Sequence, residues 1–217
     1  MSFFDALCYA FSTISTGGYA PHNASIAYYP YVSVYVVSMI FMLLGGINFS
    51  LHFLAFRRFQ FKAYWRNIEF RYYMYFLGVV SVIMSGVLIW GGTEKNAGHA
   101  ILNAFYQVIS FSTTTGFVSD GSFMHWPLFL PVFLVLIGVI GACAGSTTGG
   151  IKIIRVMLFQ LQISREIKRL IHPAGEFPIK LGTQVVPDRV MSGVWSFLSA
   201  YVFIFVIFWL ILMATGL

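Results

Sequence analysis

The segment Phe111-Ser-Thr-Thr-Thr-Gly-Phe117 determines how the rest of the chain is interpreted. Four consecutive hydroxyl residues and a glycine lie here within a strongly apolar chain, and an ordinary membrane helix has little use for such a run. A loop that offers main-chain carbonyl oxygens to a dehydrated cation does, because each carbonyl replaces one hydration oxygen. Glycine adds backbone conformations that a Cβ disfavours. The segment is therefore a candidate ion-selectivity filter.

A second segment, Phe11-Ser-Thr-Ile-Ser-Thr-Gly-Gly-Tyr19, is nearly the same. Phe11-Ser12-Thr13 matches Phe111-Ser112-Thr113, and Gly18-Tyr19 then matches Gly116-Phe117 after an insertion in the first copy. Two copies make chance a poor explanation and indicate an internal repeat. The insertion leaves open which glycine carbonyl of the first copy faces an ion.

Composition indicates an integral membrane protein. The 217 residues are 59% hydrophobic and 9% charged, with a mean hydropathy of +0.81, far from the composition of soluble domains. A bilayer core of about 30 Å needs about 20 helical residues. Continuous apolar runs predict helices rather than a barrel. The expected spans are 31–56, 72–90, 190–217 and, interrupted by small residues, 126–151.

The net charge of +6 does not indicate nucleic-acid binding, because the basic residues gather between expected spans. The positive-inside rule places both groups in the cytoplasm, and residues 91–126 and the start of the chain outside. Contact with lipid headgroups is the first interpretation of the groups, and partner docking is the alternative. Their members are Arg57, Arg58, Lys62, Arg66 and Arg71, and then Lys152, Arg155, Arg165, Lys168, Arg169, Lys180 and Arg189.

Residues 1–14 and 100–112 are apolar but too short to span. Each precedes one hydroxyl-glycine run, so each is expected to be a short helix of a re-entrant loop that enters from the outer face. In the span 31–56, the pair Gly45-Gly46 predicts close helix packing. Asn48 and His52 are four residues apart and are expected to share one inward face.

The run Gly141-Ala-Cys-Ala-Gly-Ser-Thr-Thr-Gly-Gly150 is expected to break its span in the inner half of the membrane. A flexible plug beneath the filter is the favoured interpretation, and tight packing of small residues is the alternative. A phosphate loop is not supported, because no strand precedes it and the Lys-Ser/Thr pair is missing. Lys152 either snorkels to the headgroups or stands at the pore.

The candidate filter residues share hydroxyl or glycine character. Both short helices end at the filter, so their negative dipole ends favour a cation there by up to about 1 kcal/mol. The aromatic residues Tyr19 and Phe117 are expected to wedge the loops against neighbouring helices. The filter candidates are Ser15, Thr16, Gly17, Gly18, Thr113, Thr114, Thr115 and Gly116, and the gate candidates are Gly141, Gly145, Ser146, Thr147, Thr148, Gly149, Gly150 and Lys152.

The chain resembles the TrkH/KtrB superfamily of potassium transporters, and within it the TrkH branch. The matching segments cover nearly the whole chain. They are Phe11-Ser-Thr-Ile-Ser-Thr-Gly-Gly-Tyr19, Gly45-Gly-Ile-Asn-Phe-Ser-Leu-His52, Ser112-Thr-Thr-Thr-Gly-Phe117, Gly145-Ser-Thr-Thr-Gly-Gly-Ile-Lys152, His172-Pro173 and Pro178-Ile-Lys-Leu-Gly182.

The resemblance implies an all-α membrane fold of tandem helix–pore loop–helix repeats, four around one pore, of which about two loops are present here. The implied parts are a loop and inner helix (1–56), a cytoplasmic linker (57–71), a complete repeat with a broken inner helix (72–160), a connector (161–189) and the first helix of the next repeat (190–217). Without the first repeat and the fourth loop, the chain is expected to be a fragment that does not conduct unaided.

The resemblance also implies a function and partners. These are potassium uptake across the bacterial inner membrane, K⁺ as the transported ion, no organic cofactor, a homodimer, and a cytoplasmic nucleotide-binding subunit of the TrkA type. Gly141–Gly150 is implied to be the gating loop. The alternative is a secondary transporter of another monovalent cation, which predicts inverted rather than parallel repeats. A two-loop channel subunit and a membrane enzyme are more distant, the latter because no His/Asp/Glu cluster converges at one depth.

Overall fold

The computed structural model describes residues 1–217 except 58, 93–95, 120–125, 128, 174 and 217. Arg58, one of the basic residues named above, lies outside the described residues. The chain divides into two compact units, Met1–Ile153 and Ile154–Leu217. Within its described residues the fold is helical apart from one short hairpin, as the sequence predicts.

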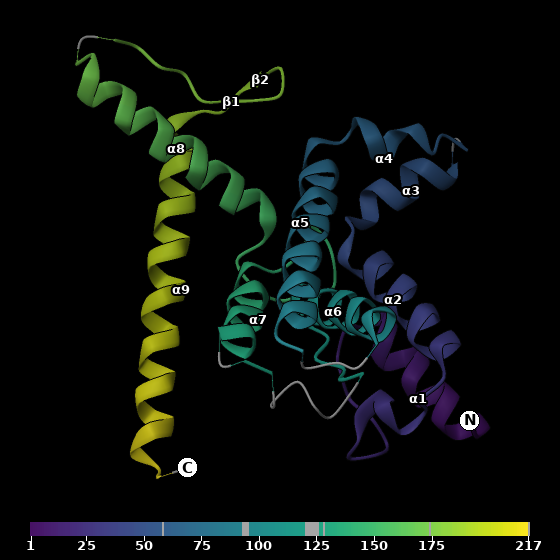
Figure 1. The fold of residues 1–217 in the computed structure, drawn as a ribbon. Helices are drawn as coiled ribbons and strands as arrows, with labels where there is room; N and C mark the ends of the chain where they lie inside the picture. Colours follow the sequence, from purple (N-terminus) through teal and green to yellow (C-terminus); the bar gives the residue numbers. More distant parts are fainter. Residues whose placement is uncertain (58, 93–95, 120–125, 128, 174, 217) are drawn as a thin grey trace. The chain divides into compact units, whose positions relative to one another are not determined.

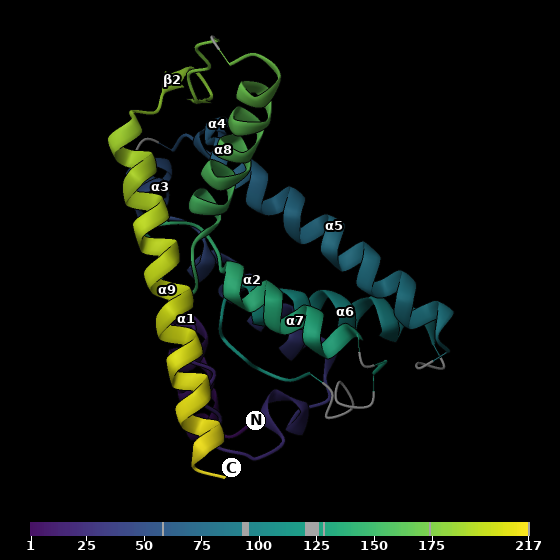
Figure 2. The same ribbon diagram turned by 90° about the vertical axis from the view of Figure 1, so that its left-hand side faces the viewer.

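The first unit contains two short helices that each end at a hydroxyl-glycine loop, α1 and α6. α6 is central, because it contacts α2, α5 and α7 (Figures 1 and 2). Asn67 begins α5 by accepting a hydrogen bond from Phe70 N at 2.9 Å, an N-cap of the ordinary kind. The helices are α1 (Phe3–Ile14), η1 (Ser25–Tyr28), α2 (Val32–Gly46), α3 (Phe49–Arg57), α4 (Lys62–Arg66), α5 (Ile68–Trp90), α6 (Ala97–Ser112) and α7 (Phe129–Ile140).

Two apolar clusters hold these helices around the loops. One joins α5, α6 and α7 through side chains such as Met84, Ala104 and Leu134, all fully buried. The other joins α1, α2 and α6 through Tyr9, Met42 and Tyr106. It also includes Phe117, in the loop after α6. The pore-loop segments are therefore anchored on well-packed helices.

The expected span 31–56 is not one straight helix. α2 ends at Gly46, and α3 departs from its direction by 98°. Asn48 lies in the break, where its Oδ1 accepts from Ser50 N at 2.8 Å and caps α3. The prediction that Asn48 and His52 share a helix face is therefore wrong. His52 Nε2 instead bridges back to the carbonyl of Leu44 at 2.8 Å.

Two of the four expected spans form single helices of spanning length and apolarity, α5 and α9. The bent pair α2 and α3 qualifies as a third when it is counted as one broken span. In the described part of the run 126–151 the helix is the 12-residue α7, because the glycine-rich segment after Ile140 ends it. Both interruptions fall where glycine and polar residues weaken the helix.

The second unit contains α8 (Ile153–Ile171), β1 (Lys180–Leu181), β2 (Gln184–Val185) and α9 (Asp188–Ala214). α8 continues through position 160, where the sequence suggested a boundary, and stops before Pro173. Arg155 stacks 3.9 Å above the Phe197 ring, and Arg165 pairs with Asp188 at 2.7 Å. These contacts and a small apolar cluster hold α8 against the start of α9.

Candidate ion pathway

The two hydroxyl-glycine loops have the same backbone conformation. Thr16 and Gly18 have left-handed φ angles of 52° and 73°, and Thr114 and Gly116 have 54° and 80°. Threonine seldom adopts this conformation, so its occurrence at both positions marks a constrained feature. Thr16 therefore corresponds to Thr114, and Gly18 to Gly116, with one residue between them in each loop.

The correspondence continues into the preceding helices without a gap. Gly17 N donates to Ser12 O at 2.8 Å, and Thr115 N donates to Ser110 O at 2.9 Å. Ser12 therefore matches Ser110, and the insertion predicted in the first copy is wrong. The repeated letters Phe-Ser-Thr lie out of structural register, because hydroxyl residues are frequent at several positions near both helix ends.

The loop carbonyls are available to an ion. Among the described residues, no hydrogen bond ends on the main-chain oxygens of Thr16, Gly17, Gly18, Thr114, Thr115 or Gly116. Unbonded carbonyl oxygens are what a dehydrated cation requires. Ser15 differs, because its carbonyl accepts from Thr16 Oγ1 at 2.7 Å. The Thr113 hydroxyl donates to Ile109 O at 2.8 Å, so the Ser15 carbonyl and the Thr113 hydroxyl each already have a partner.

The two loops lie against each other. A Cβ built at Gly18 would lie 1.7 Å from the carbonyl oxygen of Thr115. Further along, Val118 N donates to Ser25 Oγ at 3.2 Å, and Ala27 N donates to Val118 O at 3.2 Å. The structure therefore brings together filter candidates that are about one hundred positions apart in sequence.

The two aromatic residues that follow the glycines differ in environment. Phe117 is fully buried, and its ring lies 5.7 Å from that of Tyr9 in α1. Its carbonyl accepts from Ser110 Oγ at 2.7 Å. Tyr19 is 83% exposed, and its ring lies over Gly17 of its own loop. Phe117 therefore packs against α1, as the predicted wedge requires, whereas Tyr19 is mostly exposed.

A polar cluster fixes the other end of α1. Tyr29 donates to the Asp5 carboxylate at 2.5 Å, and His22 Nε2 lies 3.5 Å from the same oxygen. The Tyr29 hydroxyl lowers the pKa of Asp5 below its ordinary value, and the carboxylate raises the pKa of Tyr29 to about 12. Ionised Asp5 therefore ties the first turn of α1 to the segment that leads into α2.

The glycine-rich loop after α7 has a narrow neck. Gly141 and Gly150 face each other, and a Cβ on Gly150 would lie 2.9 Å from the Gly141 Cα. Ile151 N and Lys152 N donate to carbonyls of the last turn of α7, each at 2.9 Å. Side chains would force the neck apart, so these two glycines let the chain enter and leave the loop at one point.

The interior of the loop is filled by Lys152. Its ammonium group donates to Thr148 Oγ1 at 3.0 Å, to Ser146 Oγ at 3.2 Å and to the Thr148 carbonyl. Lys152 has a φ of +79°, which is uncommon for lysine. This conformation turns the side chain back into the loop. The snorkelling position expected as one alternative is therefore not the one that the structure shows.

The loop is hydrogen-bonded to both filter loops. Thr16 Oγ1 lies 3.1 Å from Thr147 Oγ1, and Gly149 N donates to Thr114 Oγ1 at 2.8 Å. Thr16 and Thr114 are equivalent residues of the two filter loops. The glycine-rich loop therefore contacts the same level of each.

The C-terminal end of α2 holds the glycine-rich loop through hydrogen bonds. Cys143 N donates to Gly46 O at 3.1 Å, and Thr147 Oγ1 donates to Gly45 O at 3.2 Å. A Cβ on Gly45 would lie 3.1 Å from Thr16 Cγ2. The prediction that the glycine pair marks close packing is confirmed, and the pair contacts the loops rather than only a helix.

Sequence reasoning missed one participant, Glu69 in the first turn of α5. Its side chain is 8% exposed, and Oε1 accepts from Ala144 N at 2.7 Å. The residue is surrounded in sequence by Arg66 and Arg71, so it reads as part of a solvated linker. No local pattern shows that its carboxylate faces a loop 75 positions away.

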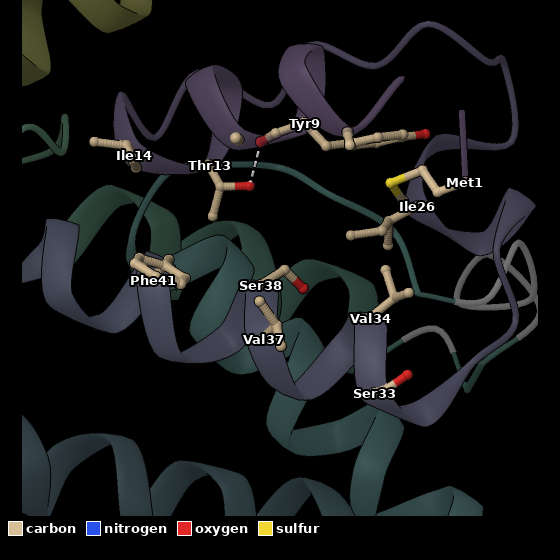
Figure 3. Close-up of a pocket in the computed structure, with 12 residues that line it drawn as sticks. Met1, Tyr9, Thr13, Ile14, Ile26, Ser33, Val34, Val37, Ser38 and Phe41 are labelled. Carbon is tan, nitrogen blue, oxygen red and sulfur yellow. Dashed lines mark hydrogen bonds between the residues drawn. The ribbon is translucent and has the colours of Figure 1, made fainter. Parts of the chain in front are cut away.

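An apolar groove of about 380 Å³ lies beside this site, between α1 and α2 (Figure 3). Ile14, Val37 and Phe41 line it, and the lining hydroxyls of Tyr9, Thr13 and Ser38 have hydrogen-bond partners. Thr13 Oγ1 donates to Tyr9 O at 2.5 Å. Because the Thr13 hydroxyl is already bonded, the groove differs chemically from the candidate ion pathway.

Comparison with known proteins agrees with this geometry. The family model TrkH, described as a cation transport protein, matches residues 1–216. The Trk system potassium uptake protein TrkH of Escherichia coli is 43% identical over 216 residues, and TrkG of the same organism is 35% identical over 217 residues. Each alignment covers the whole chain and 44% of the relative, so the chain spans less than half the length of these proteins.

A solved structure gives the same result. The crystal structure of the potassium transporter TrkH from Vibrio parahaemolyticus matches with a TM-score of 0.95 and 41% identity, over all of this chain and 47% of that one. The family model and the structural match both cover essentially every residue. The chain therefore belongs to the TrkH family of cation transport proteins.

Proposed function

We propose that the chain supplies two of the loops that line a potassium pathway. The observation that carries the proposal is the pair of adjacent loops with identical left-handed positions and unbonded carbonyl oxygens at Thr16–Gly18 and Thr114–Gly116. Fixed carbonyl dipoles return the solvation that K⁺ gives up when it sheds water. The relatives are named potassium uptake proteins, and the same cation fits this oxygen-only site.

The glycine-rich loop is the gate of this pathway. It contacts Thr16 through Thr147 and Thr114 through Gly149, at the ends of the filter loops that adjoin α1 and α6. The hydroxyls of Ser146 and Thr148 bond to each other and to Lys152 inside the loop, so these bonds move with the loop. Movement of the loop then breaks its contacts with α2, α3, α5 and the two hydroxyl-glycine loops.

We further infer the membrane location, orientation and partners of the chain. The chain lies in a bacterial inner membrane with its pore loops entering from outside, in contact with lipid and within a homodimer of longer chains. The basic residues of α8, namely Arg155, Arg165, Lys168 and Arg169, face the cytoplasm and support docking of a nucleotide-binding subunit of the TrkA type. Positive charge on the cytoplasmic side supports this orientation.

Gly116→Ser in the full-length protein tests the filter assignment. Gly116 has a φ of +80° and open space where a Cβ would lie, so the variant is strained but not blocked. A strained carbonyl position lowers discrimination, and we expect the ratio of K⁺ to Na⁺ uptake to fall by about tenfold for about 1.4 kcal/mol of lost preference. The ratio is measured in cells that lack other potassium uptake. An unchanged ratio at normal protein level contradicts the filter assignment.

A further inference from the structure

Glu69 is a buried acidic side chain. It lies in the first turn of α5 and is 8% exposed. An ionised carboxylate in such a place needs a partner, because burial without one costs several kcal/mol, about 2–7 even for uncharged polar groups. Its partner is the main-chain N–H of Ala144, at 2.7 Å. The carboxylate is therefore directed away from its own helix and toward the glycine-rich loop.

The bond to Glu69 differs in kind from the other contacts of the loop. Those contacts join neutral groups, such as Gly149 N with Thr114 Oγ1 and Cys143 N with Gly46 O. Hydrogen bonds to an ionised acceptor are about twice as strong as neutral ones. Among the described contacts, the Glu69 bond is therefore the one in which a carboxylate attaches the loop to a helix outside it.

A positive charge inside the loop adds to this attachment. The ammonium group of Lys152 occupies the loop interior, bonded to Ser146 and Thr148. The positive charge of Lys152 therefore lies within the same loop whose Ala144 N–H bonds to the Glu69 carboxylate of α5. Movement of the loop away from α5 therefore has two costs. It separates the Lys152 and Glu69 charges, and it breaks the hydrogen bond from Ala144 N to Glu69.

We propose that Glu69 is the positioning residue of the gate: its carboxylate holds the glycine-rich loop in the closed position through Ala144 N–H, and loss of that bond frees the loop. The proposal rests on the gating role given to the loop above. Glu69 acts through the loop and contacts neither the ion nor the filter.

The test compares Glu69→Ala, Glu69→Asp and Glu69→Gln in the full-length protein, reconstituted in liposomes, by K⁺ flux down a concentration gradient. Loss of a hydrogen bond to a charged group favours the freed loop, so we expect flux through Glu69→Ala to rise by about tenfold or more. Glu69→Asp keeps the charge but lacks the reach to Ala144, so it is expected to behave like Glu69→Ala. Glu69→Gln keeps a neutral acceptor at the same reach, so its rise is smaller.

The aspartate variant separates positioning from a general helix-end effect. A carboxylate that only favours the N-terminus of α5 is retained in Glu69→Asp, which then has wild-type flux. Wild-type flux in Glu69→Asp at normal protein level overturns the proposal. If Glu69→Ala does not reach the membrane, wild-type flux in Glu69→Gln overturns it instead. Glu176→Ala and Glu176→Gln repeat the same changes at an exposed acid of the second unit and serve as controls.

A shortened loop distinguishes this proposal from the gating role itself. In a variant that lacks most of the loop, Glu69→Ala is expected to give no further rise, because its target is gone. If the shortened loop raises flux and Glu69→Ala alone does not, the gating role of the loop is supported and the proposed role of Glu69 is refuted. If the shortened loop does not raise flux, the gating role fails.

Discussion

Gly18→Ala is expected to abolish potassium uptake, whereas Gly116→Ala retains a substantial part of it. Both glycines have nearly the same positive φ, 73° and 80°, so both alanines carry a similar backbone strain of about 1 kcal/mol. Only at Gly18 would the new Cβ meet another atom, the Thr115 carbonyl oxygen at 1.7 Å. Gly116 has open space. The alanine at Gly18 must therefore displace a carbonyl of the other filter loop.

Gly18→Ala and Gly116→Ala form a matched pair of variants. Uptake of K⁺ is measured for both full-length variants at equal protein level, with size-exclusion chromatography in detergent as the check of folding. The same chemical change at equivalent positions cancels the backbone strain that they share. Equal uptake by the two variants would show that the loops do not meet as described, and a larger loss at Gly116 would reverse the assignment.

Excision of the glycine-rich loop is expected to raise potassium flux severalfold or more. Gly141 and Gly150 face each other across the neck, and Ile151 N bonds to Val139 O at 2.9 Å. A short glycine link in place of residues 143–148 therefore joins α7 to Lys152 without moving either. Removal of a plug opens the path at Thr16 and Thr114, and passive K⁺ flux in liposomes measures it.

The alternative role for the loop, tight packing of small residues, gives the opposite result. The loop contacts the end of α2 through Gly45 and Gly46. If these contacts only support the fold, excision lowers both flux and the melting temperature. A control that shortens the β1–β2 turn at Gly182 and Thr183 alters an exposed segment of the second unit. Flux that falls at normal protein level would favour packing over gating.

Much of the fold was predictable from the sequence because its signals are local. Apolar runs predicted α5 and α9, and the hydroxyl-glycine runs predicted the ends of α1 and α6. The glycines from 141 to 150 predicted the interruption after α7. Each of these features depends on residues within one segment, so composition and spacing are enough to reveal it.

The predictions that were wrong concern features that depend on contacts between segments distant in sequence. The register between the two loops followed the repeated letters Phe-Ser-Thr, whereas the structure follows the left-handed positions Thr16 and Thr114. The bend after Gly46 depends on the bond from Phe49 N to Gly145 O, at 3.0 Å, between distant segments. Tyr19 and Phe117 occupy similar positions in sequence, but Phe117 is buried against Tyr9 of α1 and Tyr19 is 83% exposed.

Glu69 shows the same limit in the candidate site. In sequence it is an acid beside basic residues at the start of an apolar run. Its importance depends on the position of Ala144 N, which no periodicity encodes. The hydroxyl and glycine residues of the candidate filter were predictable because a dehydrated cation would require their chemistry, whereas the residues that hold the proposed gate are defined only by three-dimensional contact.

Anomalous diffraction from Rb⁺, a stand-in for K⁺, in crystals of the full-length protein tests the central claim most directly. The account predicts an anomalous peak beside the main-chain oxygens of Thr16–Gly18 and Thr114–Gly116, weakened in Gly116→Ser. Rb⁺ bound at side chains elsewhere, with these carbonyls turned away from it, would contradict the account.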